Sequence, residues 1–93
     1  MARDGEAAEL MAIRALGYLA DDPDRLARFV ALSGMVPQDL RAQAADPAFL
    51  GGVLDFVLGD EATLVAFADA AQVKPEAVMR ARYALPGAPP PEW

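Results

Sequence analysis

The order of apolar and polar residues along the chain predicts helices throughout, and no segment shows the strict alternation of a half-buried strand. Proline at a first helical position, after a side chain that accepts hydrogen bonds from free backbone amides, marks a helix start. Asp22-Pro23 and Asp46-Pro47 are such pairs, and Asp60-Glu61 is a third start with two carboxylates at the positive end of the helix dipole. The sequence therefore predicts an all-α fold of five or six short helices, at residues 5–20, 23–33, 37–45, 47–58, 61–72 and 75–84.

Glycines mark the expected ends of helices, because glycine reaches positive φ angles without a Cβ clash. Gly34, Gly59 and Gly87 stand at such positions. We expect Gly34 to adopt the left-handed backbone conformation at the end of the second helix. Pro37 and Pro75 begin the helices that follow two of the turns, without an obvious side-chain cap.

The spacing of apolar residues predicts how the helices pack. In the first helix the apolar stripe at helical spacing is Leu10, Ile13, Leu16 and Ala20. In the second helix Arg25 and Arg28 are expected outside, and the residues expected mostly inside are Leu26, Phe29, Val30 and Leu32. The helix at 47–58 differs, because it is apolar on nearly every side and carries Asp55 as its one charged residue. A helix that is apolar all round is buried all round, so 47–58 is predicted at the centre of a compact bundle.

The overall composition excludes several classes of function. The chain has 93 residues, with 14 acidic against 8 basic side chains, a net charge of −6, and no histidine or cysteine. A strongly basic nucleic-acid binder is thereby excluded, as are thiol chemistry, imidazole catalysis and Cys/His zinc sites. We expect no enzyme activity, no cofactor and no metal ion. One helical domain is predicted at residues 1–85, followed by a proline-rich flexible tail at 86–93.

Other features of the sequence indicate the source of the protein and its compartment in the cell. Its start, Met-Ala-Arg-Asp-Gly-Glu, leads into no apolar segment, and the longest apolar run, at 48–54, is far shorter than the roughly 20 residues that span a bilayer. Arginine outnumbers lysine seven to one and alanine is abundant, as in proteins from GC-rich bacterial genomes. We therefore expect a bacterial, cytoplasmic protein that does not bind membranes.

Several segments resemble a known family. They are LARFVALSGMVPQDLR at Leu26–Arg41, PAFLGGVLDFVLGDE at Pro47–Glu61, Pro75-Glu76 and Leu85-Pro86-Gly87. They are similar to a family of short proteins of unknown function found mainly in alphaproteobacteria, and the resemblance covers roughly residues 10–87. It implies a small all-helical domain and transfers no catalytic or cofactor-binding residue to this chain.

Four residues are candidates for binding a partner: Gly51, Gly52, Asp55 and Trp93. Glycine inside a helix costs roughly 1 kcal/mol relative to alanine, which a close helix–helix approach, or a groove that admits a partner's helix, would offset. Asp55 is expected on a narrow exposed strip or beside an arginine such as Arg14 or Arg41. Three prolines close to Trp93 favour a polyproline II segment that binds an aromatic groove, and the alternatives are a frayed terminus or Trp93 packed on the bundle.

A helix–turn–helix pattern occurs in both halves of the chain and suggests a second function. In DNA-binding versions the second helix presents arginine, asparagine or glutamine to base edges. The helix at 37–45 offers Gln38, Arg41 and Gln43, although an ordinary corner of a bundle has the same pattern. In the helix at 75–84, Glu76 is spaced to pair with Arg80, which leaves Arg82 and Lys74 as unpaired cations.

These patterns favour one function over the other. The favoured function is a non-enzymatic protein–protein interaction module with an unidentified protein partner, present as a monomer or a weak homodimer. The alternative is a helix–turn–helix regulator of nucleic acid. We expect no specific binding to nucleic acid, since the net charge of −6 opposes approach to phosphates.

Overall fold

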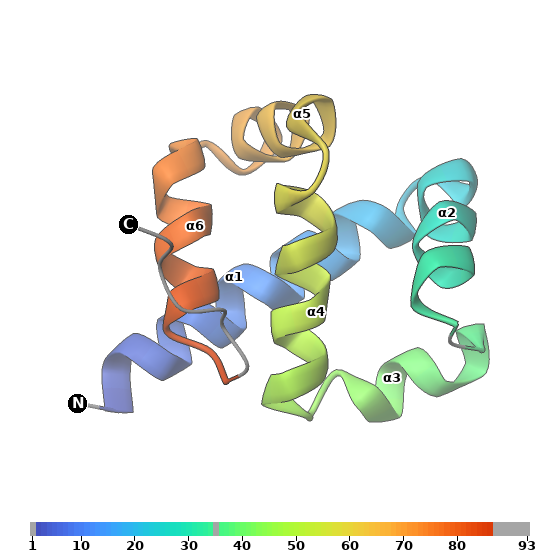
Figure 1. The fold of residues 1–93 in the computed structure, drawn as a ribbon, viewed down its shortest axis with the longest axis horizontal. Helices are drawn as coiled ribbons and strands as arrows, with labels where there is room; N and C mark the ends of the chain where they lie inside the picture. The colour runs from blue at the N-terminus through green and yellow to red at the C-terminus, as the bar shows by residue number, and fades with distance from the viewer. Residues whose placement is uncertain (1, 35, 87–93) are drawn as a thin grey trace.

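The fold is an all-α bundle of short helices, as predicted (Figure 1). The computed structural model describes residues 2–34 and 36–86, and in these ranges it contains helices and no strand. The helices are α1 (Ala2–Ala20), α2 (Pro23–Ser33), α3 (Leu40–Gln43), α4 (Pro47–Leu58), α5 (Glu61–Ala71) and α6 (Pro75–Tyr83), with a 3₁₀ helix, η1 (Pro37–Asp39), before α3. The single helix predicted at 37–45 is therefore two shorter pieces. Gly87, Trp93 and the tail beyond Pro86 lie outside the described residues.

The helix starts predicted after Asp22, Asp46 and Asp60 are confirmed, but one of them is built differently. The carboxylates of Asp22 and Asp46 each accept a hydrogen bond from the backbone amide two residues on, at 2.8 and 3.0 Å. Asp60 precedes α5 in the same extended conformation, but its side chain caps no backbone amide. Its carboxylate instead accepts a hydrogen bond from the hydroxyl of Thr63. The side chain of Asp60 thus stabilises the first turn of α5 by a hydrogen bond with the side chain of Thr63 and not with the backbone.

The helix ends follow the glycines only in part. Gly34 follows α2 with φ 73°, the left-handed conformation predicted for it. Gly59 ends α4 as expected, but with φ −76° it does not use the positive φ angles that glycine permits. The chain leaves α4 in a right-handed turn, with the Gly59 amide donating to the Asp55 carbonyl oxygen at 2.9 Å. The second left-handed helix end lies at Gln72, after α5, with φ 58°, which no glycine signals.

Helix α4 crosses the centre of the molecule, with α1 behind it and α6 beside it (Figure 1). Its core residues Leu50, Val53, Leu54 and Val57 are fully buried. The prediction that α4 is buried all round is nevertheless wrong, because Gly52 and Asp55 are exposed. Helices α1, α5 and α6 pack on α4, and α2 meets it through aromatic rings, so the strip of α4 that carries Gly52 and Asp55 remains uncovered.

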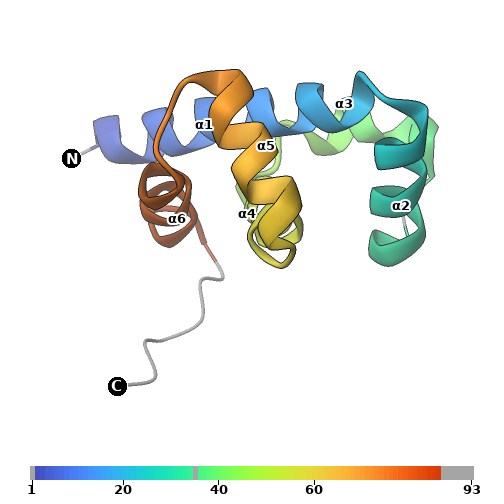
Figure 2. The same cartoon turned by 90° about the horizontal axis from the view of Figure 1, so that it is seen from above.

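Helix α1 buries a face that overlaps the predicted stripe only at Leu16, which is half-buried against the core. Leu10 and Ile13 are 61% and 45% exposed, and Ala20 is exposed as well. The buried face consists of Ala8, Ala12, Ala15 and Leu19. Small side chains let α1 approach α4 and α6 closely, since the distance between packed helices depends on the side chains at the contact. Figure 2 shows α1 along one side of the molecule, with α2, α4 and α6 projecting from the other.

Helix α2 is attached through aromatic rings. Phe29 is buried and meets the rings of Phe49 and Phe56 edge-on, with centroids 6.1 and 5.3 Å apart. Leu32, predicted to lie inside, is 73% exposed. Helix α2 packs mainly against α1, and Leu32 in its last turn lines an open pocket between α2 and α4.

Candidate functional site

The adjacent glycines of α4 have different surroundings. Gly51 is buried, and a Cβ atom built there would lie 2.9 Å from Nη1 of Arg82 and 3.2 Å from the carbonyl oxygen of Pro86. Gly52 is exposed, and a Cβ atom there would meet nothing within 4 Å. The close approach expected of the pair therefore occurs at Gly51 alone, and it is made by α6 and the chain that follows it. Gly52 leaves the surface beside it open.

The close approach at Gly51 is held by an ion pair between α4 and α6. Arg82 donates from Nε to Oδ1 of Asp55 at 2.6 Å and from Nη2 to Oδ2 at 3.0 Å. Its Nη1 donates to the carbonyl oxygens of Pro86 at 3.1 Å and Leu85 at 3.5 Å. The guanidinium thus links the centre of α4 to the chain just past α6. A bidentate arginine–carboxylate pair of this kind is geometrically specific.

Both expectations for Asp55 hold in part. It lies on the exposed strip of α4, with its side chain 53% exposed, and it also pairs with an arginine. The arginine is Arg82 rather than Arg14 or Arg41, so the predicted partners are wrong, as is the prediction that Arg82 is an unpaired cation. Sequence spacing gave no signal for this pair, because the two residues are 27 positions apart on different helices.

Two pockets flank Asp55. One, of about 280 Å³, lies between α2 and α4 and is lined by Phe29, Leu32, Ser33, Gly52, Asp55 and Phe56. The other, of about 260 Å³, lies between α4, α5 and α6 and is lined by Asp55, Leu58, Leu64, Met79, Arg82 and Tyr83. Leu32, Met79 and Tyr83 are large side chains exposed at these pockets. We call the surface formed by Leu32, Gly52, Asp55, Met79 and Tyr83 the Asp55 face.

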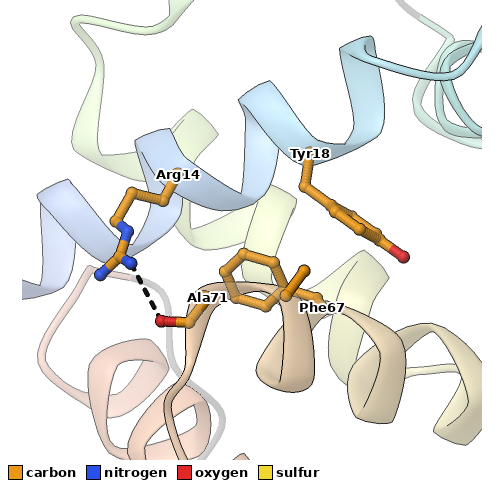
Figure 3. A pocket seen from close by; sticks show the side chains of 5 residues that line it. Arg14, Tyr18, Phe67 and Ala71 are labelled. Carbon is orange, nitrogen blue, oxygen red and sulfur yellow. Dashed lines mark hydrogen bonds between the residues drawn. The ribbon is translucent and has the colours of Figure 1, made fainter.

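A further pocket lies between α1 and α5 (Figure 3). Arg14 donates from Nη2 to the carbonyl oxygen of Ala71 at 3.1 Å, so its cation stands at the negative end of the α5 dipole. The rings of Tyr18 and Phe67 lie 5.6 Å apart, and the guanidinium carbon of Arg25 sits 3.9 Å from the centre of the Tyr18 ring. Arg25, predicted to point outward, is thus partly covered. These contacts fasten α1 to α5 and α2.

The residues proposed for nucleic-acid recognition are not gathered into a recognition helix. Gln38, Arg41 and Gln43 are all exposed, but they lie on η1 and on the single turn of α3. In the other half, Arg82 is 5% exposed and bound to Asp55. Its guanidinium is therefore held inside the bundle and does not face a groove.

The described residues form neither a multi-ligand metal site nor a membrane span. Over residues 2–34 and 36–86, no group of three or more histidine, cysteine, aspartate and glutamate side chains is placed to hold a metal ion. Over the same ranges, none of the helices has the length and hydrophobicity required to cross a bilayer.

The fold and its surfaces define a small all-α domain with an exposed strip on its central helix. The family described as "Protein of unknown function (DUF3572)" matches residues 5–88, and the chain belongs to this family. The resemblance to a family of unknown function is thereby confirmed. No curated protein and no solved structure matches the chain.

Proposed function

We propose that this domain is a non-enzymatic protein-interaction module that binds a partner through the Asp55 face. The observation that supports the proposal is the pair of apolar pockets on either side of Asp55, bordered by the exposed side chains of Leu32, Met79 and Tyr83. Contiguous exposed apolar surface marks interaction sites on soluble proteins. Aromatic residues and methionine are enriched at such sites, and methionine adapts its shape to a partner.

The charge at the centre of the Asp55 face indicates the chemistry of the partner. Arg82 takes one hydrogen-bonding position on each oxygen of Asp55, and the half-exposed carboxylate keeps further acceptor positions toward solvent. The net charge of −6 favours basic partners. The matching segment is amphipathic, with a lysine or arginine for Asp55 between two apolar side chains for the two pockets. An amphipathic helix in an apolar groove is a common form of such recognition.

The proposal is non-enzymatic because no arrangement in the described ranges resembles an active site: the Thr63 hydroxyl donates to Asp60, but this pair lies at the exposed start of α5 and lines neither pocket of the Asp55 face. There is no histidine and no cysteine in the sequence. Within the described ranges, the charged side chain that is buried is Arg82, and its donors are directed to Asp55 and to backbone carbonyls. We do not adopt the alternative of a nucleic-acid regulator, because Arg82 is buried against Asp55 and cannot contact the phosphates of DNA.

Site-specific photocrosslinking tests the proposal. A benzophenone amino acid placed at Leu32 or Met79 is expected to capture the same partner protein from native cells, because both positions border the Asp55 face. Val65 is the matched control, since it is 54% exposed on α5 and lines neither pocket. Equal capture from all three positions, or none from positions 32 and 79, contradicts the proposal.

A pull-down with surface variants adds a second readout. Leu32→Glu is expected to abolish capture of the crosslinked partner, whereas Val65→Glu is expected to leave it unchanged. A chain that ends at Pro86 is expected to retain binding. Loss of binding on that truncation, with Leu32→Glu still active, would place the site in the proline-rich tail instead.

A further inference from the structure

The outer face of α1 is apolar and uncovered. Leu10 and Ile13 are 61% and 45% exposed, and with Glu6 and Glu9 they line a shallow hollow. At about 100° per residue, this face lies roughly opposite the buried alanines of α1, and α1 packs against α4 and α6. It is thus separate from the Asp55 face.

The exposed positions have the spacing of a helix–helix seam. Leu10, Ile13, Gly17 and Ala20 are three, four and three residues apart, which is the pattern of the contacting positions in a two-stranded coiled coil. Gly17 is exposed, and a Cβ atom there would meet nothing within 4 Å. Glycine destabilises a helix interior relative to alanine, and no packing inside the chain requires it at this position. A helix that approaches closely from outside does require a small residue.

The charges beside this seam are self-complementary. Glu9 directly precedes Leu10, and Arg14 directly follows Ile13, so the two charges flank the seam on opposite sides and are five residues apart. In a parallel pair of helices, the side chain at the first of these positions on one helix meets the side chain at the second position on the other helix. A twofold axis therefore brings Glu9 of each copy beside Arg14 of the other. Arg14 uses Nη2 for the carbonyl of Ala71 and keeps N–H donors for this contact.

We propose that two copies of this chain associate weakly and in parallel through the outer faces of α1. Leu10 and Ile13 of each copy lie against the same residues of the second copy, and two Glu9–Arg14 pairs flank them. The occupant is a second copy because the charge pattern matches itself under a twofold axis. The association is weak because only two large apolar side chains of each copy enter the seam. Both Asp55 faces remain accessible in such a dimer.

Sedimentation equilibrium of the full chain over a range of concentrations tests the dimer. The native chain is expected to show a monomer–dimer equilibrium that Leu10→Glu abolishes, while Val65→Glu leaves it unchanged. Circular dichroism establishes that each variant is folded. A native chain that stays monomeric at millimolar concentration, or a dimer that Leu10→Glu does not affect, overturns the proposal.

Charge exchange tests the pairing. Glu9→Arg alone and Arg14→Glu alone are each expected to weaken the dimer about tenfold, because each substitution removes both of the exposed ion pairs that flank the seam. The variant that carries both substitutions regains native affinity, and a mixture of the two single variants forms mainly heterodimers. Because Arg14 also contacts α5, the heterodimer is the decisive readout. Single variants that dimerise like the native chain, or a mixture without heterodimer preference, overturn the assigned pairing.

Disulfide trapping tests the parallel orientation. The chain has no cysteine, so Leu10→Cys and Ile13→Cys each introduce a single thiol. In a parallel pair both positions meet their own counterparts, and both variants are expected to form disulfide dimers faster than Val65→Cys. An antiparallel pair lets at most one of the two positions meet its counterpart. Rapid trapping at one position only, or at neither, therefore overturns the parallel arrangement.

Discussion

Alanine substitutions at the two adjacent glycines of α4 are expected to change stability in opposite directions. Alanine is favoured over glycine in a helix interior by roughly 0.5–1 kcal/mol. At Gly52 nothing opposes this gain, since the added methyl group meets no atom within 4 Å. We therefore expect Gly52→Ala to raise the free energy of unfolding by about 0.5–1 kcal/mol. The same substitution one position earlier faces a different environment.

At Gly51 the methyl group would lie 2.9 Å from Nη1 and 3.1 Å from Cζ of Arg82. The end of an arginine side chain normally moves aside, but this one is held by Asp55 and by the carbonyl of Pro86. Overpacking a core costs about 1–3 kcal/mol, and breaking a buried ion pair about 3–5 kcal/mol. With the helix gain subtracted and the pair weakened but not lost, Gly51→Ala is expected to lower stability by roughly 1–3 kcal/mol.

Urea unfolding followed by circular dichroism measures both changes. With a slope of about 1 kcal/mol per molar urea, the two midpoints are expected to move in opposite directions and to separate by roughly 1.5–4 M. A third variant isolates the cause. In an Arg82→Met background most of the loss at Gly51→Ala is expected to disappear, because a flexible thioether replaces the anchored guanidinium. Shifts of the same sign at both glycines, or a loss that survives Arg82→Met, would refute the reasoning.

Three further outcomes follow from the structure. Asp55→Ala is expected to cost about 3–5 kcal/mol because it leaves a buried cation unpaired, whereas Arg82→Met leaves a half-exposed carboxylate and is expected to cost less in the same urea titration. Gly34→Val is expected to cost about 1–2 kcal/mol, because a β-branched residue is strained at φ 73°, and an unchanged midpoint would contradict this. Fluorescence anisotropy at about 0.15 M salt is expected to show no sequence-dependent binding of duplex DNA, since the net charge of −6 opposes contact with phosphates. Sub-micromolar, sequence-dependent binding would contradict that expectation.

The local features of the fold could be predicted from the sequence. The cap at Asp22, the left-handed Gly34 and the helix that begins after Asp46 each depend on chemistry within a few residues. The central place of α4 also follows from its composition, because a helix of almost uniformly apolar residues needs neighbours on most sides.

The buried face of α1 could not be predicted in the same way. Hydrophobicity ranks leucine and isoleucine above alanine, so periodicity alone favours a stripe with Leu10 and Ile13 over one with Ala12 and Ala15. The fold selects the other stripe because α1 packs against both α4 and α6, and a surface of small side chains permits close approach. Hydrophobic periodicity identifies two candidate faces, and only the tertiary packing decides between them.

In the candidate site, too, the sequence predicts the local features but not the tertiary contacts. The glycine pair and Asp55 stood out in the sequence, because glycine and a charge are unusual within an apolar helix. The different roles of Gly51 and Gly52 depend on where α6 lies, and the residue of α6 that reaches them is Arg82, 27 residues beyond Asp55. No local pattern encodes a contact of that range. The signal that was available, a lone carboxylate in an apolar helix, indicates that a cation is near but not which one.

The two uncovered surfaces of this domain share no residue, so the binding of a partner and the self-association proposed for them can be tested separately. The Asp55 face is formed by α2, α4 and α6, whereas the Leu10–Ile13 face belongs to α1 alone, and Figure 2 places α1 on the side opposite the projecting ends of the other three helices. The alanine face of α1 lies between the two surfaces and is fully packed, so a substitution at Leu10 leaves the pockets beside Asp55 intact. Leu10→Glu should therefore abolish self-association and leave photocrosslinking from Leu32 unchanged. A shared loss would show that the partner binds the dimer rather than the single domain.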